Sequence, residues 1–152
     1  MKKIALMIVL GATLSLTASA QSPYRTAAGL FIDVGDGWST VGPHIKHFFS
    51  GNDALTGLLL FGNNFTSLGA EYSYNKSIVG ANGLYWNLGV GPQVGFSNNH
   101  TSLAIRPSAG LEFKIPSAPL AFGFDWRPWW RVTDGSHFTP GRFGLSFKYT
   151  FN

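Results

Sequence analysis

The sequence predicts an all-β protein, an eight-stranded antiparallel up-and-down barrel whose strands cross a membrane. Three observations predict this fold: an export signal at the N-terminus, eight segments of alternating apolar and polar residues, and charges confined to one face of those segments. Side chains point alternately to the two faces of a strand, so a period of two residues indicates strands rather than helices.

The first 20 residues have the three parts of a secretory signal peptide. Lys2 and Lys3 are followed by an apolar run over residues 4–16 and by the small-residue site Ala18-Ser19-Ala20. The apolar run is shorter than the roughly 20 residues that a transmembrane helix needs. We therefore expect cleavage after Ala20, which leaves residues 21–152 as one barrel domain.

The composition narrows the class of protein further. The chain has no cysteine, so the fold must be stable without disulfides. For the same reason the chain has no cysteine to which a lipoprotein anchor could be attached. The formal net charge is +4, but loss of Lys2 and Lys3 leaves 9 basic residues against 7 acidic ones. Such a small excess does not favour a nucleic-acid partner.

The alternation is clearest in the last ten residues before Asn152. There every second side chain is bulky and apolar, and the residues between them are small, polar or charged. The stretch at 54–62 is apolar on both faces, so its register cannot be assigned from the pattern. Turn-forming residues separate eight such runs, which lie at 28–34, 41–49, 54–62, 68–74, 84–96, 103–115, 120–132 and 142–151.

The charges indicate which face points inward. Small residues mixed with opposite charges suit the lumen of a narrow barrel, whereas bulky apolar side chains suit lipid. A soluble barrel with its apolar face turned inward around an apolar ligand is an alternative. Eight strands leave an interior that side chains fill, so a wide pore is not expected. The polar face carries nine charges that we expect to pair in the lumen in a structural role: Glu71, Arg106, Glu112, Lys114, Asp125, Arg127, Arg131, Arg142 and Lys148.

The signal peptide, the strand count and the aromatic-ended last strand resemble the small outer-membrane barrels typified by OmpX and the OmpA membrane domain. The resemblance covers about residues 25–151. It implies a Gram-negative cell envelope, outer-membrane lipid as the surroundings, short periplasmic turns and both termini in the periplasm. It also implies a C-terminal signal for the barrel-assembly machinery, formed here by Phe143, Leu145, Phe147, Tyr149 and Phe151, although Asn152 follows the last aromatic residue.

Two short clusters invite comparison with lipid-modifying barrels. His100-Thr101-Ser102 with Glu112 resembles the residues of lipid A deacylases, but ten residues in one strand separate Ser102 from Glu112 by about 33 Å. Asp134, Ser136 and His137 resemble in type the residues of acyltransferase barrels, without matching their spacing. Both clusters are interpreted as polar loop residues.

No metal or cofactor site is predicted. His44 and His47 are three residues apart, which places them on opposite faces of a strand. We expect no enzymatic activity and no cofactor. The expected role is structural or porin-like in architecture, with an extracellular ligand contacted by loops near Trp38, Asn99 and Phe138. A lipid-modifying enzyme is the second hypothesis, and the soluble barrel is the third.

Overall fold

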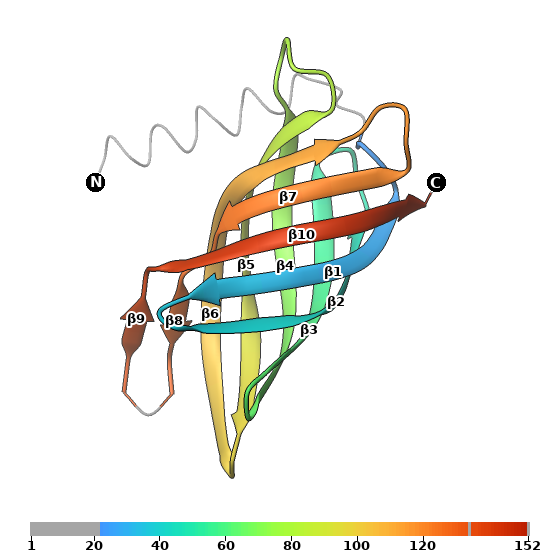
Figure 1. Cartoon of the computed structure of the whole chain (residues 1–152). Coiled ribbons are helices and arrows are strands. Elements are labelled where there is room, and N and C mark those ends of the chain that lie inside the picture. The colour runs from blue at the N-terminus through green and yellow to red at the C-terminus, as the bar shows by residue number, and fades with distance from the viewer. Residues whose placement is uncertain (1–21, 134, 152) are drawn as a thin grey trace, which may run out of the picture.

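The computed structural model describes residues 22–133 and 135–151, which form one closed antiparallel sheet (Figure 1). The predicted signal peptide lies outside the described residues. The described part of the chain contains no helix long and apolar enough to cross a membrane. Its strands are β1 (Thr26–Gly35), β2 (Trp38–Phe48), β3 (Asp53–Gly62), β4 (Phe65–Ser77), β5 (Leu84–Ser97), β6 (His100–Lys114), β7 (Leu120–Trp126), β8 (Trp129–Arg131), β9 (His137–Thr139) and β10 (Arg142–Phe151).

These ten segments make eight barrel strands, as the sequence predicts. Segments β7 and β8 continue one strand, and β9 and β10 continue the last one. The predicted run 120–132 is therefore interrupted, at Arg127-Pro128, and a second interruption lies at Pro140-Gly141. Pro128 and Pro140 have no N–H to give to a neighbouring strand, and the regular pairing stops at both. Pro43, Pro92 and Pro107 are tolerated inside paired strands.

The barrel closes between the first and last strands. β1 pairs with β2 along one edge and with β10 along the other, with Leu30 opposite Phe147. β5 and β6 are paired over their whole length and project beyond the neighbouring strands (Figure 1). With no open edge in the main wall, the backbone groups are satisfied within the sheet, as a strand in lipid requires.

Pairing with both neighbours fixes the register of β3, which the pattern left open. Leu58 and Leu60 point inward and form a buried cluster with Phe31 of β1. Leu55, Leu59 and Phe61 of the same strand point outward and are exposed.

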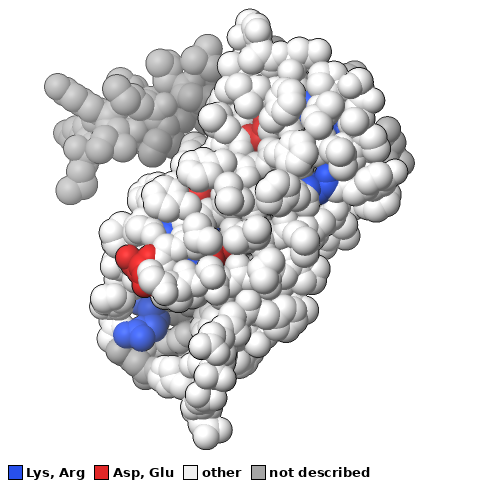
Figure 2. Space-filling view, viewed as in Figure 1, with Lys and Arg blue, Asp and Glu red and all other residues white. Residues whose placement is uncertain are grey.

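The outer surface of the barrel is apolar. Exposed side chains such as Leu30, Leu68 and Phe124 come from strands all around the wall, and Leu68 is 57% exposed. On the face shown in Figure 2, charged atoms occupy little of the surface. The predicted assembly row on β10 also lies on this side, because its partners on the inner side, from Arg142 to Thr150, are buried.

The two ends of the barrel have different connections. At the end that holds both termini, the connections span 49–52, 78–83 and 115–119. At the opposite end, here called the far end, three connections are two-residue turns, at 36–37, 63–64 and 98–99. Each contains a residue with positive φ: Asp36 at 48°, Asn64 at 55° and Asn99 at 65°.

The connections at the end of the termini are short, as the resemblance implies, and those at 36–37, 63–64 and 98–99 are shorter still. Trp38 and Phe138 belong to strands beside far-end connections, and Asn99 belongs to a two-residue turn. Asp and Asn tolerate the left-handed conformation better than most residues, which permits such tight turns.

Candidate functional site

The lumen is filled with charged side chains supplied by most of the strands. Among the described residues, four carboxylates and five cations are buried there. Burial of a charge is costly unless a partner compensates it, so their pairing decides whether the lumen is stable. The four carboxylates are Asp33, Glu71, Glu112 and Asp125, and the five cations are Lys46, Arg106, Arg127, Arg142 and Lys148.

Nearest the far end, Asp33 of β1 lies between two arginines. Its carboxylate contacts Arg106 of β6 and lies 2.9 Å from Nη2 of Arg142 on β10. Arg106 also donates to the amide oxygen of Gln93 at 3.1 Å, and Gln93 donates to Ser67 at 2.7 Å. These contacts join strands β1, β4, β5, β6 and β10 across the lumen.

In the middle of the lumen, Arg127 bridges two carboxylates. Its Nη2 is 2.8 Å from Glu71 of β4, and its Nε is 2.5 Å from Asp125 of β7. Ser108 donates to Glu71 at 3.2 Å. The guanidinium lies 4.5 Å from the ring centre of Phe31, a cation–π distance.

Nearest the termini, Glu112 of β6 lies between two lysines. It contacts Lys148 of β10, and its Oε1 is 3.6 Å from Nζ of Lys46 on β2. Lys46 also donates to Asn75 at 2.7 Å. The hydroxyl of Tyr24 donates to the same carboxylate, with oxygen–oxygen distances of 3.0 and 3.1 Å.

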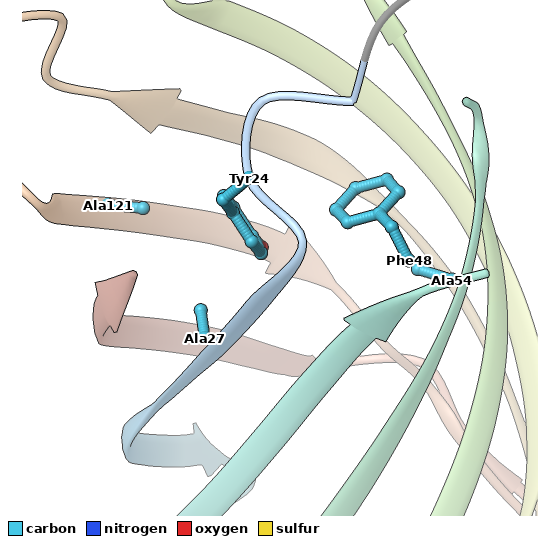
Figure 3. Close-up of a cluster of buried hydrophobic side chains, with 5 residues drawn as sticks. All are labelled: Tyr24, Ala27, Phe48, Ala54 and Ala121. Carbon is cyan, nitrogen blue, oxygen red and sulfur yellow. The ribbon is translucent and has the colours of Figure 1, made fainter. Parts of the chain in front are cut away.

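Tyr24 also helps to close this end of the barrel. The segment ahead of β1 places its ring against that of Phe48, with centroids 5.2 Å apart in an edge-to-face arrangement (Figure 3). The small side chains of Ala27, Ala54 and Ala121 surround the pair. The cavity found among the charged side chains of the lumen is only about 40 Å³, so these groups leave no wide channel.

Seven of the nine charges predicted for the lumen are buried in it. The other two lie toward the ends. Lys114 donates to the carbonyls of Ile115 and Ala118, both at 2.7 Å, in the connection before β7. Arg131 lines a cavity at the far end and makes no ion pair with a described acid.

Sequence reasoning missed three members of these groups. Asp33 and Lys46 occupy inward positions in the alternating pattern. The alternation of side chains between the two faces of a strand is therefore enough to place both in the lumen. Tyr24 precedes the first strand, and no periodicity predicts that its chain turns into the barrel.

The first of the two clusters that were compared with catalytic groups is not assembled. Ser102 and Glu112 lie ten residues apart along β6. Glu112 contacts two lysines at the end of the barrel that holds the termini. Ser136 accepts a hydrogen bond from the Trp130 indole at 3.0 Å, whereas Asp134 lies outside the described residues. A nucleophile, a base and an orienting acid must be within hydrogen-bond reach of one another, which Ser102 and Glu112 are not.

The two strand histidines lie on opposite faces, as predicted. His44 is buried with its ring 5.5 Å from that of Phe31, and His47 is exposed and hydrogen-bonded to Thr26 at 2.7 Å. In the described part of the chain, no three His, Cys, Asp or Glu side chains are grouped so as to hold a metal ion.

Comparison with known proteins identifies the fold. No family model matches the chain, and no curated protein matches it. The structure is similar to the crystal structure of the N-terminal β-barrel domain of OprF from Pseudomonas aeruginosa, with a TM-score of 0.62. The match covers 82% of this chain and 96% of that domain at 12% identity. The predicted eight-stranded barrel of the OmpA type is confirmed at the level of the fold.

Proposed function

We propose that this chain is an integral β-barrel protein of a bacterial outer membrane, with a structural or surface-interaction role. The observation that carries the proposal is the outward-facing apolar wall. Large apolar side chains are exposed on strands all around the barrel, including Leu68 at 57% and Leu88 at 54%. Soluble monomers rarely expose apolar patches larger than a few hundred Å², whereas lipid solvates such a surface.

The lumen argues against the soluble ligand-binding alternative. A barrel that stores an apolar ligand needs an apolar, open interior. The described interior instead holds nine buried charges and a cavity of about 40 Å³. The same filling supports a role other than transport through a wide pore.

The proposed orientation places both termini in the periplasm and the far end outside the cell. The two-residue turns at 36–37, 63–64 and 98–99 are too short to form large binding loops. An extracellular ligand would therefore contact the rim of the barrel, near Trp38 and the tip of the β5–β6 hairpin.

Membrane insertion is tested by placing a charge on the lipid face. Leu88→Arg should reduce the stability of the barrel in lipid vesicles by about 2–4 kcal/mol. The matched control is Val79→Arg in the β4–β5 connection, where Val79 is 100% exposed and the charge stays in water. Equal tolerance of both changes, or a native protein that stays monomeric without detergent, would overturn the proposal.

Recognition by the barrel-assembly machinery is tested at the C-terminal strand. Phe151→Ser should lower the amount of heat-modifiable protein in the outer membrane more than deletion of Asn152 does. The reason is that Phe151 ends the row of outward-facing apolar side chains on β10, the strand that closes the barrel with β1.

The second hypothesis, a lipid-modifying enzyme, is tested by analysis of membrane lipid A with and without expression of the protein. Lipid A should be unchanged; a newly modified species would favour the enzyme.

A further inference from the structure

A cavity at the far end of the barrel lies beyond the charged lumen. Its volume is about 700 Å³, within the range of about 300–1,000 Å³ that is typical of small-molecule sites. Strands β2, β3, β4, β5, β6 and β8 and the turns at 36–37 and 63–64 contribute to its wall. It is therefore a feature of the rim, separate from the ion pairs described above.

Three aromatic side chains form one side of this cavity. Trp38, Phe65 and Trp129 contact one another edge to face, with centroid distances of 5.5, 6.0 and 6.2 Å. Arg142 and Arg106 lie over the rings of Trp38 and Trp129, at 3.4 and 5.1 Å. Both arginines are buried and do not line the cavity, so the aromatic trio separates it from the lumen and is held rigidly from behind.

The remaining wall is polar and carries a cation. Ser39, Thr40, Ser97 and Ser102 contribute hydroxyl groups. Arg131 lines the same cavity and makes no ion pair with a described acidic side chain. No described acidic side chain lines the cavity. A guanidinium in the wall without a compensating carboxylate favours an anionic ligand.

We infer that this cavity binds a phosphorylated saccharide. Aromatic faces pack against the C–H face of a sugar ring, and hydroxyl side chains exchange hydrogen bonds with sugar hydroxyls. The guanidinium of Arg131 presents the geometry that pairs with phosphate oxygens. The saccharide can be a free sugar phosphate or the headgroup of a phosphorylated glycolipid, since both present the same chemistry.

Titration of the purified barrel in detergent micelles tests this inference. Glucose 6-phosphate, glucose and inorganic phosphate are the probes, and isothermal calorimetry or tryptophan fluorescence measures binding. Glucose 6-phosphate should bind at least tenfold more tightly than either other probe. Equal binding of inorganic phosphate would overturn the saccharide, and a lack of saturable binding would overturn the site.

Arg131→Gln should weaken binding of glucose 6-phosphate at least tenfold and leave glucose unchanged. Arg25→Gln is the matched control, because Arg25 is exposed at the opposite end and the charge change is the same. Heat-modifiable migration on gels establishes that both variants are folded. Equal loss of affinity in the two variants would mean that the net charge of the protein, and not Arg131 itself, determines binding. That result would overturn the assignment of Arg131.

Phe65→Leu tests the aromatic wall separately. It should weaken the binding of glucose 6-phosphate several-fold without changing the binding of inorganic phosphate. An unchanged affinity for glucose 6-phosphate would contradict stacking of the sugar on the trio.

Lipid A in mixed micelles distinguishes a glycolipid headgroup from a free sugar phosphate as the source of the ligand. Its competition with glucose 6-phosphate assigns the site to a glycolipid headgroup, and lack of competition assigns it to a free sugar phosphate.

Discussion

Buried charges are compensated at both ends of the lumen, but by arginines at one end and by lysines at the other. Toward the far end, Asp33 lies between Arg106 and Arg142. Toward the termini, Glu112 lies between Lys46 and Lys148. In each group one buried carboxylate compensates two cations, and aromatic rings pack beside the charges at both ends: Trp38 and Trp129 at the arginines, and Tyr24 and Phe48 at the lysines.

The arginines differ from the lysines in what else they hold. Arg106 donates to the carbonyl of Arg127 at 2.6 Å, at the break between β7 and β8. Arg142 donates to the carbonyls of Gly35 and Trp38 at 2.5 and 2.9 Å, across the first far-end turn. A guanidinium has five donors in a fixed plane, so it can bind a carboxylate and fix irregular backbone together. The arginine group therefore shapes the rim beside the cavity, and the lysine group fills the end where Tyr24 packs.

The largest loss of stability is expected in the group formed by Asp33, Arg106 and Arg142. Asp33→Asn leaves two buried guanidinium groups without their carboxylate and should lower the free energy of unfolding by about 3–5 kcal/mol. Urea titration of the barrel in detergent, read by gel mobility, measures the change. Asp36→Asn in the neighbouring exposed turn should change it by less than about 0.5 kcal/mol. Similar losses in both variants would show that the pairing in the lumen is not the cause.

Glu112→Gln should cost about 3 kcal/mol near neutral pH, for the same reason at the lysine end. The same urea titration measures this loss. A variant that is as stable as the native protein would contradict the role of Glu112 as the partner of both lysines.

A smaller effect is expected where Tyr24 closes the lysine end. Tyr24→Phe keeps the ring against Phe48 but removes the hydroxyl that donates to Glu112, and should cost about 2 kcal/mol. Tyr149→Phe is the control, because Tyr149 is exposed on the outer face of β10. Chemical unfolding of both variants provides the measurement, and equal stability of the two would mean that Tyr24 only fills space.

The smallest effect concerns the tight turns that leave the far end open. Asn99 has a φ of 65°, so Asn99→Ala should cost about 1 kcal/mol, whereas Asn99→Gly should be nearly neutral. Thermal unfolding of the two variants compares them directly. A larger loss for glycine would show that the Asn99 side chain, rather than its backbone conformation, stabilises the hairpin.

The sequence determined the eight strands and the direction of most side chains. Alternation is a local property, so it placed Glu71, Arg106 and Arg127 on the buried face and Leu88 on the exposed one without knowledge of the pairing. It could not orient β3, where both faces are apolar. Only pairing with β2 and β4 decided that Leu58 faces the lumen and Leu59 faces outward.

What only the tertiary structure decided is which charges meet and which space remains open. Asp33 and Arg106 are 73 residues apart, and Tyr24 and Glu112 are 88 apart; these contacts depend on strand stagger and closure of the barrel. The proline breaks, the aromatic trio and the cavity beside Arg131 depend on the same geometry. A period of two residues specifies a face but not a height along the barrel, and contacts across a lumen require both.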